Sequence, residues 1–376
     1  MNVQEQIAVK KNINMKSKII PTIGALVILL LHSCGLLDDA QRMSHQEFLQ
    51  SHKYAVGQAT MELMDHTRER PVKTEIWYPT KDTTQLNVTI EFPFILPPTS
   101  RDADVVPGKH PLIMLSHGTG GNRISQMWLA CELAGNGYIV AAVDHHGNTL
   151  DNKIPVNFVK VWDRPLDITF AIDQILTNGR WGASIDTSHI GMVGFSLGGY
   201  TAIGLAGGVL DYNLLSDFSK TKEGKVEFDL PELGDVSSLI TSDIIASGNQ
   251  QYNDLKDQRI SAFVAMAPAL GQGFNRIDQF EQVDQSLLII GARNDERTPV
   301  HTNAKHYHEL IRGSQYIELN EEVGHYIFMN EATSDLKRNA PVVFKDHESV
   351  DRAEIHKKVA KLITMFFKTE WDSQNR

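Results

Sequence analysis

From Pro111 onward, the sequence alternates short, continuous apolar runs with stretches in which apolar residues recur every three or four positions. The apolar runs are Leu112–Leu115, Tyr138–Val143, Ile190–Phe195, Ala262–Ala267, Leu287–Ile290 and Tyr316–Leu319. The helical stretches are Ile124–Asn136, Leu166–Thr177, Thr298–Ile311 and, at the end, about Ser349 to Lys368. Apolar runs that alternate with amphipathic helices are typical of buried strands in parallel βαβ units. The pattern predicts an α/β protein with a mostly parallel, doubly wound sheet.

Three segments depart from this alternation. Val56–Met64 and Val72–Tyr78 alternate apolar and polar residues around a charged turn, which predicts an N-terminal antiparallel hairpin. Residues 210–257 and the stretch Tyr326–Val350 are irregular. Long insertions in compact domains are often lids or binding loops. We therefore expect one domain, 53–376, with an inserted lid or cap segment at about 210–257.

The N-terminus has a different character. Four lysines precede an apolar run from Ile19 to Leu31, and Cys34 follows shortly after it. A basic start and an apolar run of this length indicate a secretory signal, since the run is short for a transmembrane helix. The cysteine resembles a bacterial lipobox, which implies cleavage before Cys34 and a diacylglyceryl group on its sulfur. An ordinary signal peptide or a single anchor helix is the alternative, and Met15 is an alternative start to Met1.

This reading assigns residues 1–33 to a lipoprotein signal peptide and residues 34–52 to a flexible tether. It predicts an exported bacterial lipoprotein, anchored in a membrane through Cys34 and facing the periplasm or the cell surface. Cys131 is the other of the two cysteines and falls in a helical pattern, so we expect a buried, inert thiol there. A formal net charge of −10, without a Lys/Arg-rich stripe, argues against a nucleic-acid partner.

A serine flanked by glycines, Gly194-Phe195-Ser196-Leu197-Gly198, lies between a predicted strand and a predicted helix. In that setting, Gly-x-Ser-x-Gly forms a sharp turn that exposes the serine hydroxyl above the sheet. Alone, the pentapeptide is a weak signal, and the alternative is that Ser196 is only a small residue in a glycine-rich bend. A serine nucleophile needs a base, and the base needs an acid that orients it.

Asp295 and His325 are the candidates for that acid and base. Asp295 follows the apolar run Leu287–Ile290, and His325 lies on the loop after the next run. Carboxyl ends of parallel strands meet at one edge of the sheet, and sites of this kind have the chain order Ser, Asp or Glu, His. Glu296 is the second choice for the acid, whereas Asp284 precedes its strand and belongs to the opposite edge.

Other histidines lie near the expected site. Asp144-His145-His146 ends a predicted strand on the same edge and either lines the pocket or is simply loop polarity. The histidines of the stretch Thr298–Ile311 (His301, His306 and His308) are expected at the surface or in a second layer. They lack zinc-type spacing with acidic partners, so we expect no metal.

The segment Ser116-His117-Gly118-Thr119-Gly120-Gly121 follows another strand and supplies a candidate oxyanion hole. Its glycines allow backbone N–H groups to point inward, and the expected donors are the amides of Thr119 and Leu197. A phosphate cradle is the alternative, but the segment lacks the Lys-Ser/Thr ending of a P-loop and the spaced glycines of a dinucleotide site.

From about Met61 to Phe328 the chain resembles the α/β-hydrolases grouped with predicted dienelactone hydrolases and plasma-type platelet-activating-factor acetylhydrolases, to which bacterial cutinase-like polyesterases are related. The motifs that carry the resemblance are Arg70-Pro71-Val72 through Trp77-Tyr78-Pro79, Ser116 through Arg123, Asp163-Arg164-Pro165-Leu166-Asp167, Gly194 through Gly199, Asp295 through Val300, and Gly324-His325-Tyr326-Ile327-Phe328.

The resemblance implies an α/β-hydrolase fold and a cofactor-free esterase or lipase, with Ser196, Asp295 and His325 as the triad and Thr119 and Leu197 as oxyanion amides. Dienelactone hydrolase proper has a cysteine at the position of Ser196, which argues against a dienelactone substrate. Phe195 replaces the commoner histidine before the nucleophile, which we expect to change packing beneath the turn. Arg164 and Asp167 are interpreted as an ion pair at the start of a helix.

Together these features favour a serine carboxylester hydrolase that acts through an acyl-enzyme on short-acyl or lipid-like esters. A thioesterase or peptidase would use the same residues and remains open. A non-catalytic, cell-surface binding lipoprotein on a hydrolase scaffold is the alternative from another class. The predicted partners are a small-molecule or lipid ester and the membrane that holds the anchor; the oligomeric state is not predicted.

Overall fold

The computed structural model describes residues 45–83, 86–87, 93–231, 233–251, 255–320 and 322–374. The chain divides into two units, Met1–Leu36 and Leu37–Arg376. The predicted signal peptide (1–33), the alternative start at Met15 and the lipidation site Cys34 lie outside the described residues. In the part of the chain that the structure describes, no helix has both the length and the apolar character needed to span a bilayer.

A mixed β-sheet forms the centre of the second unit, with the order β12-β11-β10-β7-β5-β6-β2-β1-β4-β3. From β6 to β12 the neighbouring strands are parallel, whereas β1 and β2 form an antiparallel hairpin whose second strand pairs antiparallel with β6. The strands are β1 Ala55–Asp65, β2 Arg70–Thr80, β3 Leu86–Asn87, β4 Thr99–Arg101, β5 His110–Ser116, β6 Ile139–Val143, β7 Ile185–Phe195, β10 Ile260–Met266, β11 Ser286–Ala292 and β12 Gln315–Leu319. Each apolar run predicted as a strand is one, and the hairpin is confirmed.

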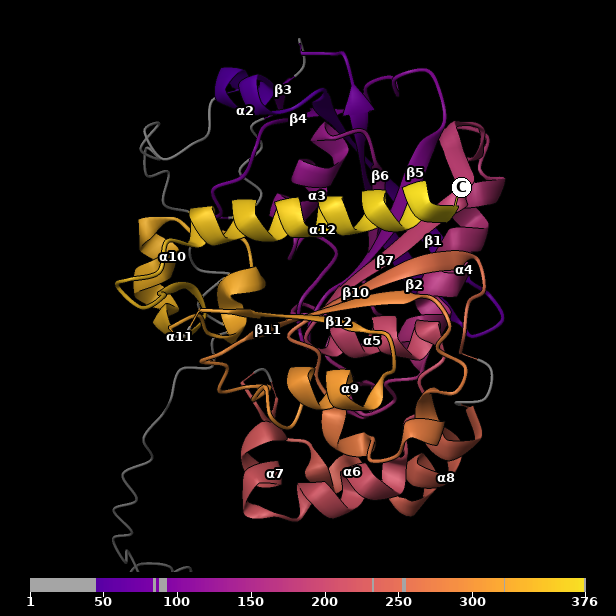
Figure 1. Cartoon of the computed structure of the whole chain (residues 1–376), viewed down its shortest axis with the longest axis vertical. Coiled ribbons are helices and arrows are strands. Elements are labelled where there is room, and N and C mark those ends of the chain that lie inside the picture. Colours follow the sequence, from indigo (N-terminus) through magenta and orange to yellow (C-terminus); the bar gives the residue numbers. More distant parts are fainter. Residues whose placement is uncertain are drawn as a thin grey trace, which may run out of the picture. The chain divides into compact units, whose positions relative to one another are not determined.

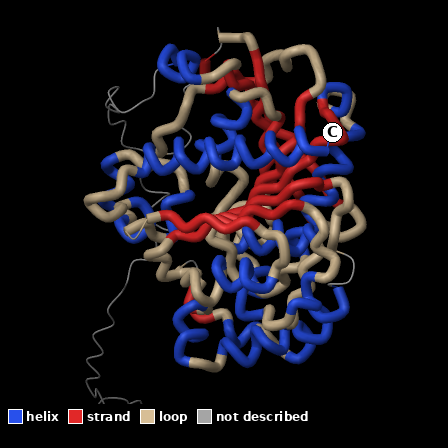
Figure 2. Tube along the Cα trace, viewed as in Figure 1, coloured by secondary structure: helices blue, strands red, loops and turns tan. Residues whose placement is uncertain are grey.

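Helices cover both faces of the sheet (Figures 1 and 2). Alternate residues of a strand face opposite sides, so Ile113 and Leu115 of β5 join one core, whereas Leu112 and Met114 join the other. The first core contains residues of α3 (Met127–Gly135) and α12 (Arg352–Gln374); the second contains residues of α4 (Asp163–Thr177), α5 (Leu197–Ala206) and α9 (Ala304–Leu310). Cys131 is fully buried in α3, as expected, and burial raises the pKa of its thiol.

The segment between α5 and β10 is largely helical. It contains α6 (Tyr212–Ser219), α7 (Lys222–Glu227), a small hairpin of β8 (Asp229–Leu230) and β9 (Gly234–Asp235), and α8 (Ser242–Gln251). In Figure 1 these helices gather beyond α9, on the side away from the sheet. After β12, the chain forms a 3-10 turn, η9 (His325–Phe328), and two short helices, α10 (Ser334–Asn339) and α11 (Pro341–Phe344), before α12.

Several predicted boundaries differ in the structure, and two of the differences have a clear physical reason. The stretch expected as a tether to residue 52 includes helix α2 (His45–Ser51), whose Phe48 is only 1% exposed and stacks on His52. Helix α2 therefore belongs to the folded part, which was expected to begin at residue 53, because the buried Phe48 side chain anchors it. Residues 34–44 of the expected tether lie outside the described residues. The helix expected from Thr298 begins only at Ala304, since Thr298 bonds back to Asp295 and the residues after it form turns.

Candidate active site

Ser196 occupies the sharp turn between β7 and α5. Its φ of 55° lies in the left-handed region, which side chains other than glycine rarely adopt. Hydrogen bonds to the end of β10 and the residues after it hold the backbone there: Ser196 N–H donates to the Met266 carbonyl at 2.9 Å, and the Ser196 carbonyl accepts from Ala269 N–H at 3.0 Å. The neighbouring strand thus stabilises the strained turn.

The glycines around Ser196 are required by close backbone contacts. A Cβ atom on Gly194 would lie 1.8 Å from the Gly198 carbonyl oxygen. A Cβ atom on Gly198 would lie 1.9 Å from the Ser116 carbonyl oxygen, at the end of β5. These distances are far below van der Waals contact, so only glycine fits at either position without backbone movement.

His325 and Asp295 lie beside Ser196. Nε2 of His325 is 3.0 Å from Oγ of Ser196, and Nδ1 of His325 is 2.7 Å from Oδ2 of Asp295. Ser196 and His325 are 6% and 7% exposed, so both are shielded without being sealed from solvent, whereas the Asp295 side chain is fully buried. This arrangement can pass a proton from the serine hydroxyl to an imidazole whose tautomer is fixed by a carboxylate.

Thr298 also belongs to this group, although no sequence signal singled it out. Its hydroxyl lies 2.9 Å from Oδ2 of Asp295 and 3.2 Å from Nδ1 of His325. The backbone N–H groups of Arg297 and Thr298 donate to the other oxygen, Oδ1 of Asp295, at 2.8 and 2.6 Å. The carboxylate of Asp295 is therefore oriented by its own loop. In a sequence, a hydroxyl residue three positions after the candidate acid is the signal that would indicate such a hydrogen-bond partner.

Phe195 packs against the imidazole. Its ring centroid lies 4.9 Å from that of His325 and 5.6 Å from that of Phe328. The phenyl ring forms an apolar support below the histidine, in the place where the resemblance leads one to expect another histidine. Unlike a histidine at this position, the phenyl ring itself can neither donate nor accept a proton.

The glycine-rich loop after β5 lies next to the turn at Ser196. A Cβ atom on Gly118 would lie 3.2 Å from Cβ of Ser196, and Gly120 has a φ of 64°. Gly121 N–H closes a turn on the Gly118 carbonyl at 3.1 Å, with Thr119 inside it. Leu197 is the first residue of α5, so its N–H is not used by the helix. The two predicted oxyanion amides therefore lie on backbone segments that flank Ser196.

The other candidate acids lie elsewhere. Glu296 is exposed, and Asp284 is exposed and pairs with Lys256 before β11 begins. The carboxylate that contacts His325 is that of Asp295.

The histidines outside this group have other partners. His306 contacts the Phe274 carbonyl at 2.7 Å, His308 contacts Ser314 at 2.9 Å, and His301 is exposed. Neither interpretation of His145 was right: its ring is fully buried between Ser116 and Asp167.

The ion pair predicted between Arg164 and Asp167 is also wrong. Asp167 pairs with Arg70 and Arg68, each at 2.9 Å, because the start of β2 and the turn before it bring the two guanidinium groups against the helix. Arg164 points the other way, towards the loop after β5. Sequence proximity suggested the wrong partner, since the better donors come from 97 residues earlier in the chain.

Two comparisons with known proteins agree with this architecture. Residues 95–152, which include the glycine-rich loop, match the family described as platelet-activating factor acetylhydrolase, isoform II. The fold is similar to that of a ferulic acid esterase from Streptomyces cinnamoneus, with a TM-score of 0.57 and 17% identity over 85% of this chain and 90% of that one. No match was found among curated proteins. By its strand order and its sharp turn at Ser196 the chain has an α/β-hydrolase fold, and over residues 95–152 it is similar to the platelet-activating-factor acetylhydrolase family.

Proposed function

We propose that the chain is a serine carboxylester hydrolase that works through an acyl-enzyme. The observation that carries the proposal is the pair of contacts from His325, 3.0 Å to Ser196 and 2.7 Å to Asp295. The matching family and the similar solved structure are, by their descriptions, an acetylhydrolase and an esterase, which favours an ester substrate.

In this mechanism, Oγ of Ser196 attacks the ester carbonyl while Nε2 of His325 takes the hydroxyl proton. Asp295 accepts a hydrogen bond from Nδ1–H and stabilises the imidazolium that forms. The amides of Thr119 and Leu197 donate to the oxyanion of the tetrahedral intermediate. His325 then returns the proton to the departing alkoxide. In the second half of the reaction, His325 takes a proton from water as the water attacks the acyl-enzyme, and returns it to Oγ of Ser196 as the acid leaves.

Ser196→Ala tests the assignment directly. It should lower the hydrolysis of p-nitrophenyl acetate by at least about 10³-fold, and a fluorophosphonate probe should label the wild type but not the variant. Ser188→Ala is the matched control, since Ser188 lies on the same strand, exposed at its opposite end. Retention of activity in Ser196→Ala, or equal labelling of both proteins, would refute the assignment. Failure of the wild type to react with the probe would favour a binding protein on a hydrolase scaffold.

The substrate is proposed to be a short-acyl or lipid-like ester. A screen of p-nitrophenyl esters of increasing acyl length, with phospholipid, polyester, thioester and peptide substrates alongside, tests this choice. Highest kcat/KM on acetate or butyrate supports it, whereas a preference for a thioester or a peptide replaces it with the alternative that uses the same residues.

We also propose that the protein is an exported lipoprotein anchored through Cys34, on the basis of the lysine-rich start and the apolar run Ile19–Leu31. Expression with a radiolabelled fatty acid should label the wild type and leave Cys34→Ser unlabelled. Label in both proteins, or in neither, would reject the anchor.

A further inference from the structure

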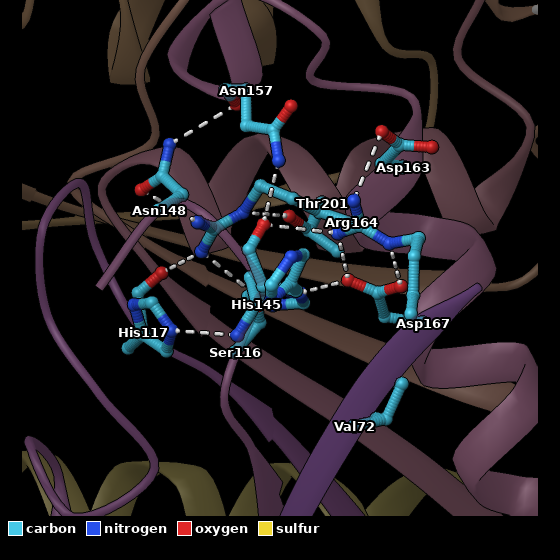
Figure 3. Close-up of polar contacts among 12 residues, drawn as sticks. Val72, Ser116, His117, His145, Asn148, Asn157, Asp163, Arg164, Asp167 and Thr201 are labelled. Atoms are coloured by element: carbon cyan, nitrogen blue, oxygen red, sulfur yellow. Dashed lines mark hydrogen bonds and ion pairs between the residues drawn. The ribbon is translucent and has the colours of Figure 1, made fainter. Parts of the chain in front are cut away.

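Close to the turn at Ser196, where Gly198 packs against the Ser116 carbonyl, a second serine, histidine and aspartate meet with similar hydrogen-bond distances. Figure 3 shows this cluster. Oγ of Ser116 lies 2.9 Å from Nε2 of His145, and Nδ1 of His145 lies 3.0 Å from Oδ2 of Asp167. Ser116 is 1% exposed and the other two are fully buried, so no substrate can reach this hydroxyl. The cluster is therefore not a second active site, and its role must be exerted through the residues that it touches.

The protonation states of the cluster follow from burial. Burial, with the nearby Arg164 charge, lowers the pKa of His145 to about 3, so the ring is neutral at neutral pH. Burial alone would raise the pKa of Asp167, but hydrogen bonds from His145 and Arg70 hold it below its usual value. Nδ1–H of a neutral His145 thus donates to the Asp167 carboxylate, and Nε2 accepts the hydroxyl proton of Ser116. The Ser116 oxygen is left free to accept from another donor.

That donor is Arg164, in the first turn of α4. Its side chain is 1% exposed, and Nη2 donates to Oγ of Ser116 at 3.3 Å and to the His117 carbonyl. Burial lowers the pKa of Arg164 to about 9, so the guanidinium remains charged at neutral pH. A buried charge is costly unless its N–H groups are satisfied. The N–H groups of Arg164 are satisfied by neutral oxygens on several segments. The guanidinium therefore holds these segments in place relative to one another.

Two of those segments carry the proposed oxyanion amides. Nη1 of Arg164 donates to Oδ1 of Asn148 at 3.4 Å, and the same oxygen accepts from Gly120 N–H at 3.1 Å, next to Thr119. Nε of Arg164 donates to Oγ1 of Thr201 at 3.3 Å, and that hydroxyl donates to the Leu197 carbonyl at 3.0 Å. One guanidinium therefore contacts the loop after β5 directly, at the His117 carbonyl, and is connected to the first turn of α5 through Thr201 (Figure 3).

The two segments also lie in close backbone contact. A Cβ atom on Gly198 would lie 1.9 Å from the Ser116 carbonyl oxygen at the end of β5 and 2.8 Å from the His117 carbonyl oxygen in the loop after it. A small shift of either segment would change the separation of the amides, and misplacing a reacting group by about 1 Å can cost about 10²-fold in rate. We propose that Arg164 is a positioning residue for ester hydrolysis, which fixes the Thr119 and Leu197 amides relative to each other; the inference rests on the proposed function.

An ester and the matching thionoester measure this role directly. Replacing the carbonyl oxygen with sulfur gives a larger atom and a weaker hydrogen-bond acceptor, so donors placed for oxygen discriminate against it. The ratio of kcat/KM for the ester to kcat/KM for the thionoester reports on the oxyanion amides. It is independent of the fraction of folded enzyme, because that fraction cancels.

Three variants are compared with the wild type. Arg164→Lys keeps the charge but loses the fork of donors, and Thr201→Val removes one link while keeping the shape of the side chain. Both should lower kcat for the ester by about 10²-fold or less with little change in KM, and lower the ester-to-thionoester ratio by about tenfold. Arg352→Lys is the matched control, since Arg352 is also buried and binds the Met329 and Asn330 carbonyls. It should leave the ratio unchanged.

Hydrogen exchange supplies a readout that does not require activity. Amides in the peptide spanning residues 117–121 should exchange faster in Arg164→Lys and Thr201→Val than in the wild type, and at the wild-type rate in Arg352→Lys. Unchanged exchange in this peptide in both test variants would overturn the inference, whether or not the wild type hydrolyses an ester. Absence of ester hydrolysis by the wild type would instead refute the proposed function. An unchanged ratio in both test variants, with an active wild type, would overturn the positioning role and leave the proposed function standing.

Discussion

Glu227, the last residue of α7, connects the inserted segment to the loop that carries Asp295. Its carboxylate accepts hydrogen bonds from Gln272, from Asn303 at 3.3 Å and from Thr302 at 3.3 Å. Burial raises the pKa of Glu227 to about 7; the three hydrogen bonds oppose this rise, and the negative charge of Asp295 adds to it. Above neutral pH the carboxylate is ionised in the folded protein, and this ionisation lowers the stability of the fold.

The substitution Glu227→Gln removes this ionisation while keeping the size of the side chain. A pKa that moves from 4.5 to about 7 on folding corresponds to about 3 kcal/mol, which we reduce to about 2 kcal/mol because the side chain keeps some contact with water. The folded protein binds the proton more tightly than the unfolded chain. The contribution of Glu227 protonation to the stability of the folded protein is therefore complete below pH 4.5 and is lost as the pH rises through 7.

Urea unfolding at pH 5 and at pH 8 measures the effect. The variant should be close to the wild type at pH 5 and more stable than it by about 2 kcal/mol at pH 8. Glu223→Gln is the matched control, because Glu223 is an exposed carboxylate in the first turn of the same helix. If the wild type and Glu227→Gln lose stability equally between the two pH values, the carboxylate is not held in the buried environment described here.

Two further substitutions probe the candidate site. Thr298→Val removes the hydroxyl that contacts Asp295 and His325, and should lower kcat by about tenfold with KM unchanged, because a hydrogen bond to a charged group is lost; equal kcat values in steady-state assays would contradict this. Gly198→Ala places a Cβ atom 1.9 Å from the Ser116 carbonyl oxygen, and should lower thermal stability by about 1–3 kcal/mol together with activity. Gly179→Ala, where the new Cβ meets nothing within 4 Å, is its control, and equal melting temperatures for the two would count against the close contact.

The strands and the edge of the sheet could be predicted from the sequence because both depend on local pattern. The run Ile190–Phe195 is apolar throughout since β7 is buried on both faces, and that needs no knowledge of its partners. In the sequence, Ser196, Asp295 and His325 each follow one of the predicted strands, which are β7, β11 and β12 in the structure. Their meeting follows from the parallel arrangement of β7, β11 and β12, which brings these strand ends to the same edge.

The partners of Arg164 could not be predicted in this way. The local pattern offered Asp167 one helical turn later, and a helix-start ion pair was the obvious interpretation. In the folded protein Arg70 and His145 already satisfy that carboxylate, so the arginine is available to the loop after β5. Competition among donors from distant segments decides such pairings, and it becomes visible only when those segments are placed together. The same holds for Glu227, whose partners lie 45–76 residues further along the chain.

The two serine–histidine–aspartate groups show which properties the proposed reaction would need beyond the three side chains. Their hydrogen-bond distances are nearly equal, 3.0 and 2.7 Å at Ser196 against 2.9 and 3.0 Å at Ser116. Ser196 differs in being partly accessible, in sitting on a strained turn with positive φ, and in lying beside N–H groups that can hold an oxyanion. Ser116 has none of these and instead accepts a hydrogen bond from Arg164. A triad geometry therefore indicates a nucleophile only together with access and a place for the developing charge.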